Sequence, residues 1–127
     1  MRHNELFGIV IDCAIDIHRR LGPGLLESVY QEALQREFLA KVLPHEREFN
    51  LPIFYRGQRL QSVFRTDFVC FGSLVVELKA LPRLSGVEEA QILHYLKASG
   101  LTKAILLNFG TPRLEYKRFV RTLPQSP

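Results

Sequence analysis

Two charged residues interrupt an apolar segment near the middle of the chain. Glu77 and Lys79 lie within LVVELKA, residues 74–80, whose other members are all apolar. Side chains two residues apart on a β-strand point to the same face, so both charges share one face of this predicted strand. At roughly 7 Å and an effective dielectric of ~20 their attraction is about 2.4 kcal/mol, whereas desolvation costs several kcal/mol per ion. The pair alone therefore does not stabilise a buried strand, and a metal ion or an open cleft would explain its presence.

A further carboxylate is expected beside this pair. Asp67 lies in the preceding stretch, RTDFVCF, and the turn at Gly72 returns the chain next to the Glu77 strand. Neighbouring carboxylates repel each other unless a cation lies between them, and oxygen ligands completed by water suit Mg²⁺ or Mn²⁺. The ammonium of Lys79 could orient a water molecule, help to deprotonate it and stabilise charge on a phosphate. The chemistry that these residues predict is phosphodiester hydrolysis.

Two more polar residues fall on helix faces that are expected to look inward. Glu27 lies in the first turn of the second predicted helix, at the edge of its apolar stripe, where the helix dipole favours an anion. It could reach a metal ion through water. Gln91 shares a helical stripe with Val87, His94 and Ala98, so its amide could point toward the sheet and bind a water molecule or a phosphate oxygen.

Each of these residues also has a purely structural interpretation. A Glu-x-Lys pair on a strand is most often a solvated ion pair between strands. Glu27 could be an exposed residue favoured by the helix dipole. Gln91 could be an amide on the helix surface. In a further alternative the polar residues form only a structural ion network, in which case a metal ion neither binds nor stabilises the fold.

The predicted elements must bring these residues together. Apolar periodicity and segments rich in Phe, Val, Ile and Tyr predict helices over 6–21, 25–40 and 87–99, three strands within 46–80, and further strands over 103–109 and 114–120. The strand at 74–80 is apolar on both faces apart from its two charges, so it is predicted to be central. The order predicts an α/β protein with a mixed central sheet flanked by helices. The tail at 123–127 is expected to be frayed.

Length and composition set the class of protein. A chain of 127 residues with 46% hydrophobic residues predicts a single domain over 1–127 with a substantial core. No apolar run approaches the ~18 residues of a membrane span, so no association with a membrane is expected. Cys13 and Cys70 lie in apolar stretches and are expected to be buried free thiols, which fits a reducing cytoplasm.

Charge permits a polyanionic partner. The formal net charge is +4, and because Glu27, Asp67, Glu77 and Lys79 together carry −2, the rest of the chain carries +6. That surplus would help to hold phosphates near an acidic centre. The basic residues considered for such contacts are Arg65, Arg83, Lys97, Lys117, Arg118 and Arg121. Most Phe and Tyr residues are expected in the core, so no stacking platform for single strands is predicted.

Several motifs in one order resemble a known family. Gly24-Leu-Leu-Glu27-Ser-Val-Tyr30 resembles the signature of the GxxExxY proteins, and the resemblance continues through LPIFYRG, the Asp67 strand, VVELKA, Ala90-Gln91 and LLNFG at 106–110. It covers nearly the whole chain. That family is similar to the PD-(D/E)xK nuclease superfamily, so the resemblance implies a restriction-endonuclease-like core.

The resemblance also implies roles for particular residues. Asp67 and Glu77 correspond to the metal ligands, Lys79 to the catalytic lysine, Glu27 to the acidic residue on a preceding helix and Gln91 to the accessory amide of the following helix. Thr66 stands where the family pattern has Pro, and because Pro contributes no ligand, this difference is expected to matter little.

Two functions of different classes follow. The first is a Mg²⁺- or Mn²⁺-dependent nuclease that hydrolyses phosphodiester bonds of DNA or RNA. The alternative is a non-catalytic nucleic-acid- or protein-binding module on the same fold, which the small size of the chain favours. The intact Asp67 and Lys79 favour catalysis. A homodimer is expected by analogy alone.

Overall fold

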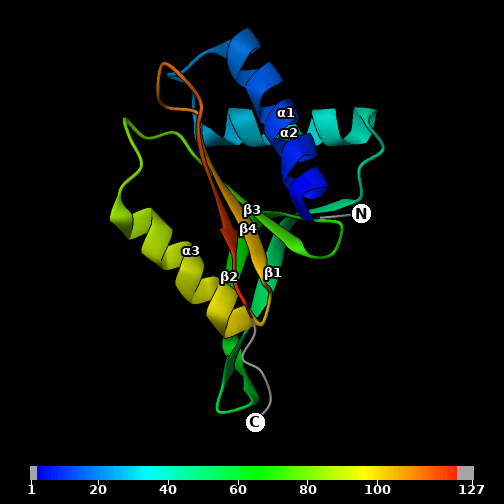
Figure 1. Ribbon diagram of the computed structural model, residues 1–127, viewed down its shortest axis with the longest axis vertical. Coiled ribbons are helices and arrows are strands. Elements are labelled where there is room, and N and C mark those ends of the chain that lie inside the picture. The colour runs from blue at the N-terminus through cyan, green and yellow to red at the C-terminus, as the bar shows by residue number, and fades with distance from the viewer. Residues whose placement is uncertain (1–2, 123–127) are drawn as a thin grey trace.

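The chain folds into helices and strands in the order that the sequence predicted (Figure 1). The structure is a computed structural model in which residues 3–122 are described, so the fraying expected at 123–127 lies outside the described residues. The elements between residues 3 and 122 are α1 (His3–Leu21), α2 (Glu27–Ala40), β1 (His45–Tyr55), β2 (Gln58–Cys70), β3 (Leu74–Lys79), α3 (Gly86–Ser99), β4 (Lys103–Asn108) and β5 (Glu115–Val120).

The strands form one mixed sheet in the order β1-β2-β3-β4-β5. Strands β1, β2 and β3 form an antiparallel meander, β3 pairs with β4 in parallel, and β5 returns antiparallel to β4. A parallel pair needs a crossover connection, and α3 supplies it. β3 is the central strand of the sheet, which confirms the prediction made from its apolar sequence.

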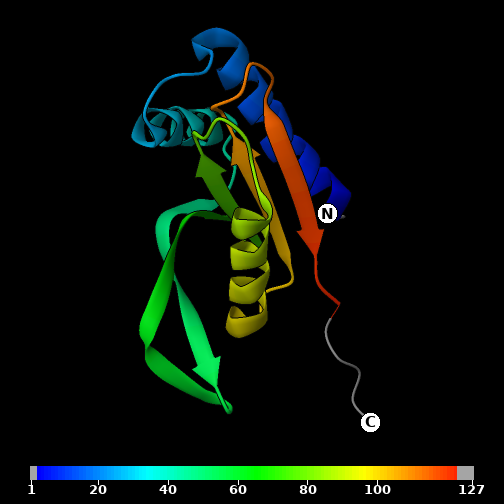
Figure 2. The same cartoon turned by 90° about the vertical axis from the view of Figure 1, so that its left-hand side faces the viewer.

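Helices cover both faces of the sheet. On one face α1 and α2 pack against a core that includes Phe68, Val76 and Leu78, and on the other α3 packs against a core that includes Val75 and Leu106. Figure 2 shows α3 on the side of the sheet away from α1. Successive residues of β3 thus enter different cores, which explains why this strand is apolar on both faces.

The two cysteine thiols are placed as the sequence predicted. Cys13 and Cys70 are both buried and free. Within residues 3–122, no helix is long and apolar enough to cross a membrane.

β1 and β2 continue beyond the rest of the sheet as a two-stranded ribbon. Their pairing extends to Tyr55↔Gln58, whereas the pairing of β2 with β3 ends at Phe68↔Val76. We call residues 49–66 the β1–β2 ribbon. It projects past the sheet and runs alongside α3 (Figure 2), and the ring of Phe64 stacks on Tyr95 of α3 with centroids 3.7 Å apart.

Candidate functional site

Side chains replace the backbone ladder at the point where β2 and β3 separate. Backbone pairing runs from Cys70↔Leu74 to Phe68↔Val76 and then stops. Beyond it, the N–H of Leu78 donates to Oδ2 of Asp67 at 2.9 Å, and the N–H of Asp67 donates to Oε1 of Glu77 at 3.0 Å. The two carboxylates predicted to be neighbours therefore bridge the two strands side by side.

Glu77 is the more deeply buried of the two carboxylates. Only 8% of the residue is exposed, and its Oε1 accepts hydrogen bonds from Asp67 N–H and from the hydroxyl of Thr66. Its Oε2 has no hydrogen-bond partner within residues 3–122. Burial, reinforced by repulsion from Asp67, raises the pKa of Glu77 to about 7, while the two hydrogen bonds and the charge of Lys79 oppose that rise. The carboxyl of Glu77 therefore titrates near neutral pH.

Asp67 is half-buried and held from the helical side by an amide. Gln31 of α2 donates through Nε2 to Oδ1 of Asp67 at 2.9 Å. Burial raises the pKa of Asp67, and the charge of Glu27 adds to the rise. The hydrogen bonds from Leu78 and Gln31 and the charge of Lys79 work in the opposite direction.

An arginine fixes the orientation of that amide. Arg47 of β1 donates through Nε and Nη2 to Oε1 of Gln31 at 3.0 and 2.8 Å, and through Nη1 to Oε1 of Gln35 at 2.7 Å. Because the guanidinium has only donors, it holds the amide oxygen and leaves the amide nitrogen for Asp67. Sequence reasoning missed both Gln31 and Arg47. The available signal was that Gln31 follows Glu27 by four residues, which places both on one face of the helix.

Glu27 and Lys79 lie within electrostatic reach of the two carboxylates. Glu27 begins α2 and is exposed, and its charge raises the pKa of Asp67. Lys79 ends β3 half-buried, and its charge lowers the pKa of both carboxyls. Neither side chain makes an ion pair with them within the part of the chain that is described. The structure thus gathers four of the five predicted site residues in one region.

Gln91 makes no hydrogen bond to this group within residues 3–122. It is exposed on α3 and lines a hollow of about 420 Å³ with Ile53 of the ribbon and Tyr95. The α3 residues that pack on the sheet are Ile92 and Leu96. The helix is therefore rotated so that the stripe containing Gln91 faces the ribbon rather than β3.

Thr66 corrects the expectation that the residue before Asp67 matters little. This fully buried residue places its hydroxyl 2.7 Å from Oε1 of Glu77 and 3.1 Å from the carbonyl oxygen of Val76. A proline would offer no hydroxyl to either acceptor. Thr66 therefore helps to hold the carboxylate of Glu77 even though it contributes no charge.

The LLNFG segment holds the backbone that follows Lys79. The N–H of Phe109 donates to the carbonyl of Lys79 at 2.8 Å. The buried amide of Asn108 accepts from Leu81 N–H at 2.9 Å and donates to the carbonyl of Leu81 at 3.1 Å and to Glu115 at 2.9 Å. Gly110 packs so closely that an added Cβ would lie 2.2 Å from the Leu81 carbonyl oxygen. These contacts fix the backbone conformation of residues 79–81, at and directly after Lys79.

The donor set of Asp67 and Glu77 suits Mg²⁺ or Mn²⁺. Among residues 3–122, no group of three or more His, Cys, Asp and Glu side chains is placed to hold a metal ion. Mg²⁺ is commonly held by one or two carboxylates and completes its coordination with water and substrate phosphates. Two adjacent carboxylates, one with an oxygen that accepts no hydrogen bond in this range, meet that need. A cation between them would also relieve the repulsion that Asp67 exerts on Glu77.

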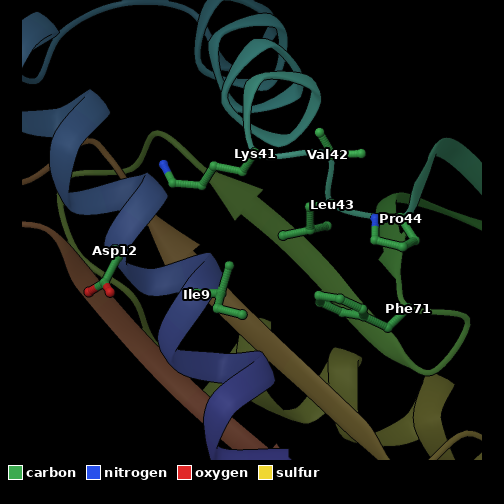
Figure 3. A pocket seen from close by; sticks show the side chains of 7 residues that line it. All are labelled: Ile9, Asp12, Lys41, Val42, Leu43, Pro44 and Phe71. Atoms are coloured by element: carbon green, nitrogen blue, oxygen red, sulfur yellow. The ribbon is translucent and has the colours of Figure 1, made fainter. Parts of the chain in front are cut away.

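An apolar hollow lies elsewhere on the molecule. It has a volume of about 480 Å³ and is lined by Ile9 and Asp12 of α1, by residues 41–44 after α2, and by Phe71 of the β2–β3 turn (Figure 3). None of the five predicted site residues lines it, so this hollow is separate from the carboxylate site.

Comparison with known proteins gives the class of this protein. A family model described as the PD-(D/E)XK nuclease superfamily matches residues 4–119. The chain therefore belongs to the PD-(D/E)XK nuclease superfamily, and the predicted restriction-endonuclease-like fold class is confirmed.

One solved structure supports the same fold. The crystal structure of SSO0001 is similar with a TM-score of 0.57 and 21% sequence identity over 76% of this chain. The present chain spans 50% of that chain. A search of curated proteins gives no match.

Proposed function

We propose that this protein is a metal-dependent phosphodiesterase that hydrolyses nucleic acid. The observation that supports this most strongly is the juxtaposition of Asp67 and Glu77, two carboxylates linked through Asp67 N–H at 3.0 Å where β2 and β3 separate. Burying two acids side by side without a cation is unfavourable: burial raises the pKa of both carboxyls, and the charge of Asp67 raises the pKa of Glu77 further. Membership of a nuclease superfamily supports the same assignment. The motif order further leads us to infer that the chain is a GxxExxY protein.

Each site residue has a role in this proposal. Asp67 and Glu77 would hold Mg²⁺ or Mn²⁺, which when bound supplies positive charge to a phosphoryl oxygen. Lys79 places its ammonium beside the scissile phosphate, orients the attacking water and stabilises the charge that develops on the phosphate. Glu27 accepts a hydrogen bond from water next to Asp67. Gln91 binds a phosphate farther along, on the side of α3 that faces the ribbon.

Two other residues position the carboxylates. Gln31 donates to Asp67, and Thr66 donates to Oε1 of Glu77, which leaves Oε2 of Glu77 without a hydrogen-bond partner within residues 3–122. The buried free thiols Cys13 and Cys70 are consistent with a reducing compartment, for which we favour the cytoplasm. A homodimer stays a prediction.

The proposal is tested by cleavage of labelled DNA and RNA with Mg²⁺ or Mn²⁺. We expect cleavage by the native protein and none by Asp67→Asn or Lys79→Ala. Matched controls are Asp12→Asn, an exposed acid on α1, and Lys41→Ala, an exposed lysine paired with Glu37 at 3.3 Å. Both should cleave like the native protein.

The result separates the alternatives. Cleavage that survives Asp67→Asn in a folded protein would overturn the assigned site. Nucleic-acid binding without cleavage under any metal would favour the non-catalytic module. Failure of both metal ions to bind or to stabilise the protein, even with nucleic acid present, would leave the polar residues as a structural network.

A further inference from the structure

The β1–β2 ribbon carries charge of one sign only. Residues 49–66 contain Arg56, Arg59 and Arg65 and no Asp or Glu. The ribbon therefore has a formal charge of +3, compared with +4 for the whole chain. A surface of this kind attracts a polyanion.

Two of these arginines are not committed to acidic partners. Arg59 makes no hydrogen bond or ion pair within residues 3–122, and the Arg56 guanidinium lies over the ring of Tyr55 at 5.6 Å. Arg65 lies 3.8 Å from Glu48, but 64% of its side chain remains exposed. The neighbouring rings of Phe54 and Tyr55 are 45% and 61% exposed, as exceptions to the expected burial of the aromatic residues. The end of the ribbon thus presents cations and rings together to solvent.

The turn at the ribbon tip shows that Arg56 is held in a costly conformation. Arg56 and Gly57 both have positive φ, at 52° and 75°, as the two central residues of a type I′ hairpin turn between Tyr55 and Gln58. Asn, Asp or Gly are favoured at the first of these positions, because a larger side chain is strained there. Strained residues cluster where function requires them, so the choice of arginine at the most projecting point favours a binding role.

The position and size of the ribbon match one kind of polyanion. It begins at Thr66, directly beside Asp67, and the nine steps from Asp67 to Gln58 span about 30 Å at about 3.4 Å per residue. That is close to one turn of B-form DNA, whose helical repeat is roughly 34 Å. The major groove of B-form DNA admits a two-stranded β-ribbon, whereas that of A-form RNA is too deep and narrow for side chains to read.

We propose that the β1–β2 ribbon is the arm that docks duplex DNA next to the carboxylate site, with Arg56 and Arg59 contacting phosphates. This rests on the proposed nuclease function and names both its substrate class and the surface that binds it. The ribbon holds the duplex along about one turn while Asp67 and Glu77 lie at its base.

The test measures binding without cleavage. In an Asp67→Asn background, binding of a fluorescent DNA duplex is followed by anisotropy over a range of salt concentrations. We expect Arg56→Gly and Arg59→Ala each to weaken binding about tenfold and to reduce the slope of log affinity against log salt by about 1. Arg56→Gly also removes the strain at the tip, so its folded state should be as stable as that of the parent or more so, and lost binding cannot be attributed to unfolding.

Arg20→Ala and Arg36→Ala are the matched controls. Each removes one exposed arginine from α1 or α2, where it lies within 3.1 Å of Asp16 or 3.7 Å of Glu32. Equal loss of binding in these controls would overturn the proposal, because net charge alone would then explain the effect. Tighter binding of an RNA duplex than of DNA would also overturn it.

The inference and the proposed function fail in different ways. If the native protein cleaves DNA and the ribbon variants bind DNA as tightly as their parent, the proposed role of the ribbon is wrong and the proposed nuclease activity stands. If DNA binding depends on the ribbon but no metal ion supports cleavage, the proposed role of the ribbon is supported and the proposed nuclease activity is wrong. Absence of DNA binding by Asp67→Asn even at low salt overturns the arm.

Discussion

The hydroxyl of Thr66 lies 2.7 Å from Oε1 of Glu77, so a neutral side chain on β2 holds a site carboxylate on β3. The backbone N–H of Asp67 donates to the same oxygen at 3.0 Å. Both donors hold Oε1, and Oε2 is left without a hydrogen-bond partner within residues 3–122. The orientation of Glu77 is therefore set by the strand that carries Asp67.

Thr66→Val should destabilise the protein mainly when Glu77 is charged. The substitution keeps the shape of the side chain but removes the donor to the carboxylate, which costs about 1–3 kcal/mol for a buried acceptor. The pKa of Glu77 should rise further above its present value of about 7, because the Thr66 hydrogen bond lowers it. Denaturant unfolding at several pH values measures both effects. Thr66→Ser, which restores the hydroxyl, should recover most of the loss, and equal stability of all three proteins above neutral pH would contradict the expectation.

The metal-free protein should lose stability as pH rises through neutrality. Folding raises the pKa of Glu77 from 4.5 to about 7, chiefly by burial, so the folded state binds this proton more tightly than the unfolded state. The contribution is therefore complete below about pH 4.5 and is lost as pH rises through about 7. At about 1.4 kcal/mol for each pH unit, the loss is about 3 kcal/mol. The raised pKa of Asp67 acts in the same direction.

Unfolding free energies of the native protein and Glu77→Gln, measured in a chelator between pH 5 and 8, check this. The native protein should decline over the range, and Glu77→Gln should follow a flatter curve and be more stable at the alkaline end. A decline of the same size in both proteins would show that other groups cause it.

Mg²⁺ or Mn²⁺ should bind with release of a proton. A ligand carboxylate must be deprotonated, so binding below the pKa of Glu77 should release up to about one proton and binding well above it should release almost none. Calorimetric titration in two buffers of different ionisation enthalpy counts these protons, and thermal unfolding should show stabilisation by the ion. Asp67→Asn should abolish both signals, and metal binding that is independent of pH would argue against Glu77 as a ligand.

Gln31→Leu should weaken metal binding without touching a proposed ligand. The change removes the donor to Asp67 and the acceptor of two Arg47 hydrogen bonds, so the pKa of Asp67 should rise. Loss of a side chain that orients a metal ligand typically lowers metal affinity by about 10- to 100-fold. Gln35→Leu, which removes one Arg47 contact and none to Asp67, is the control. Equal metal affinity in the two variants would contradict the positioning role.

Gly110→Ala should disrupt the chain that follows Lys79. The new Cβ would lie 2.2 Å from the carbonyl oxygen of Leu81, a backbone atom that cannot move away alone. Overpacking of this kind costs about 1–3 kcal/mol or more. Gly8→Ala is the matched control, since nothing lies within 4 Å of its added Cβ and alanine favours a helix interior. Thermal unfolding should separate the two, and equal midpoints would contradict the expectation.

The sequence by itself determined the elements and the central pair of carboxylates. Asp67, Glu77 and Lys79 could be placed together because strand alternation and the turn at Gly72 are local properties of the chain. The apolar composition of residues 74–80 indicated a strand covered on both faces, and β3 is central in the sheet. Strand alternation, a turn and a local apolar composition can be predicted from sequence because each depends only on residues that are close together in the chain.

Only the tertiary structure decided how the carboxylates are held and which way α3 faces. Gln31 of α2 donates to Asp67, and Arg47 of β1 holds Gln31. Thr66 of β2 donates to Glu77 of β3 beyond the point where backbone pairing of these two strands ends. The sequence left open whether Gln91 faces the sheet or lies on the helix surface; in the structure Ile92 and Leu96 of α3 are buried and Gln91 is exposed. Successive helix positions differ by about 100°, so packing against the sheet, which no local pattern specifies, selects the buried face.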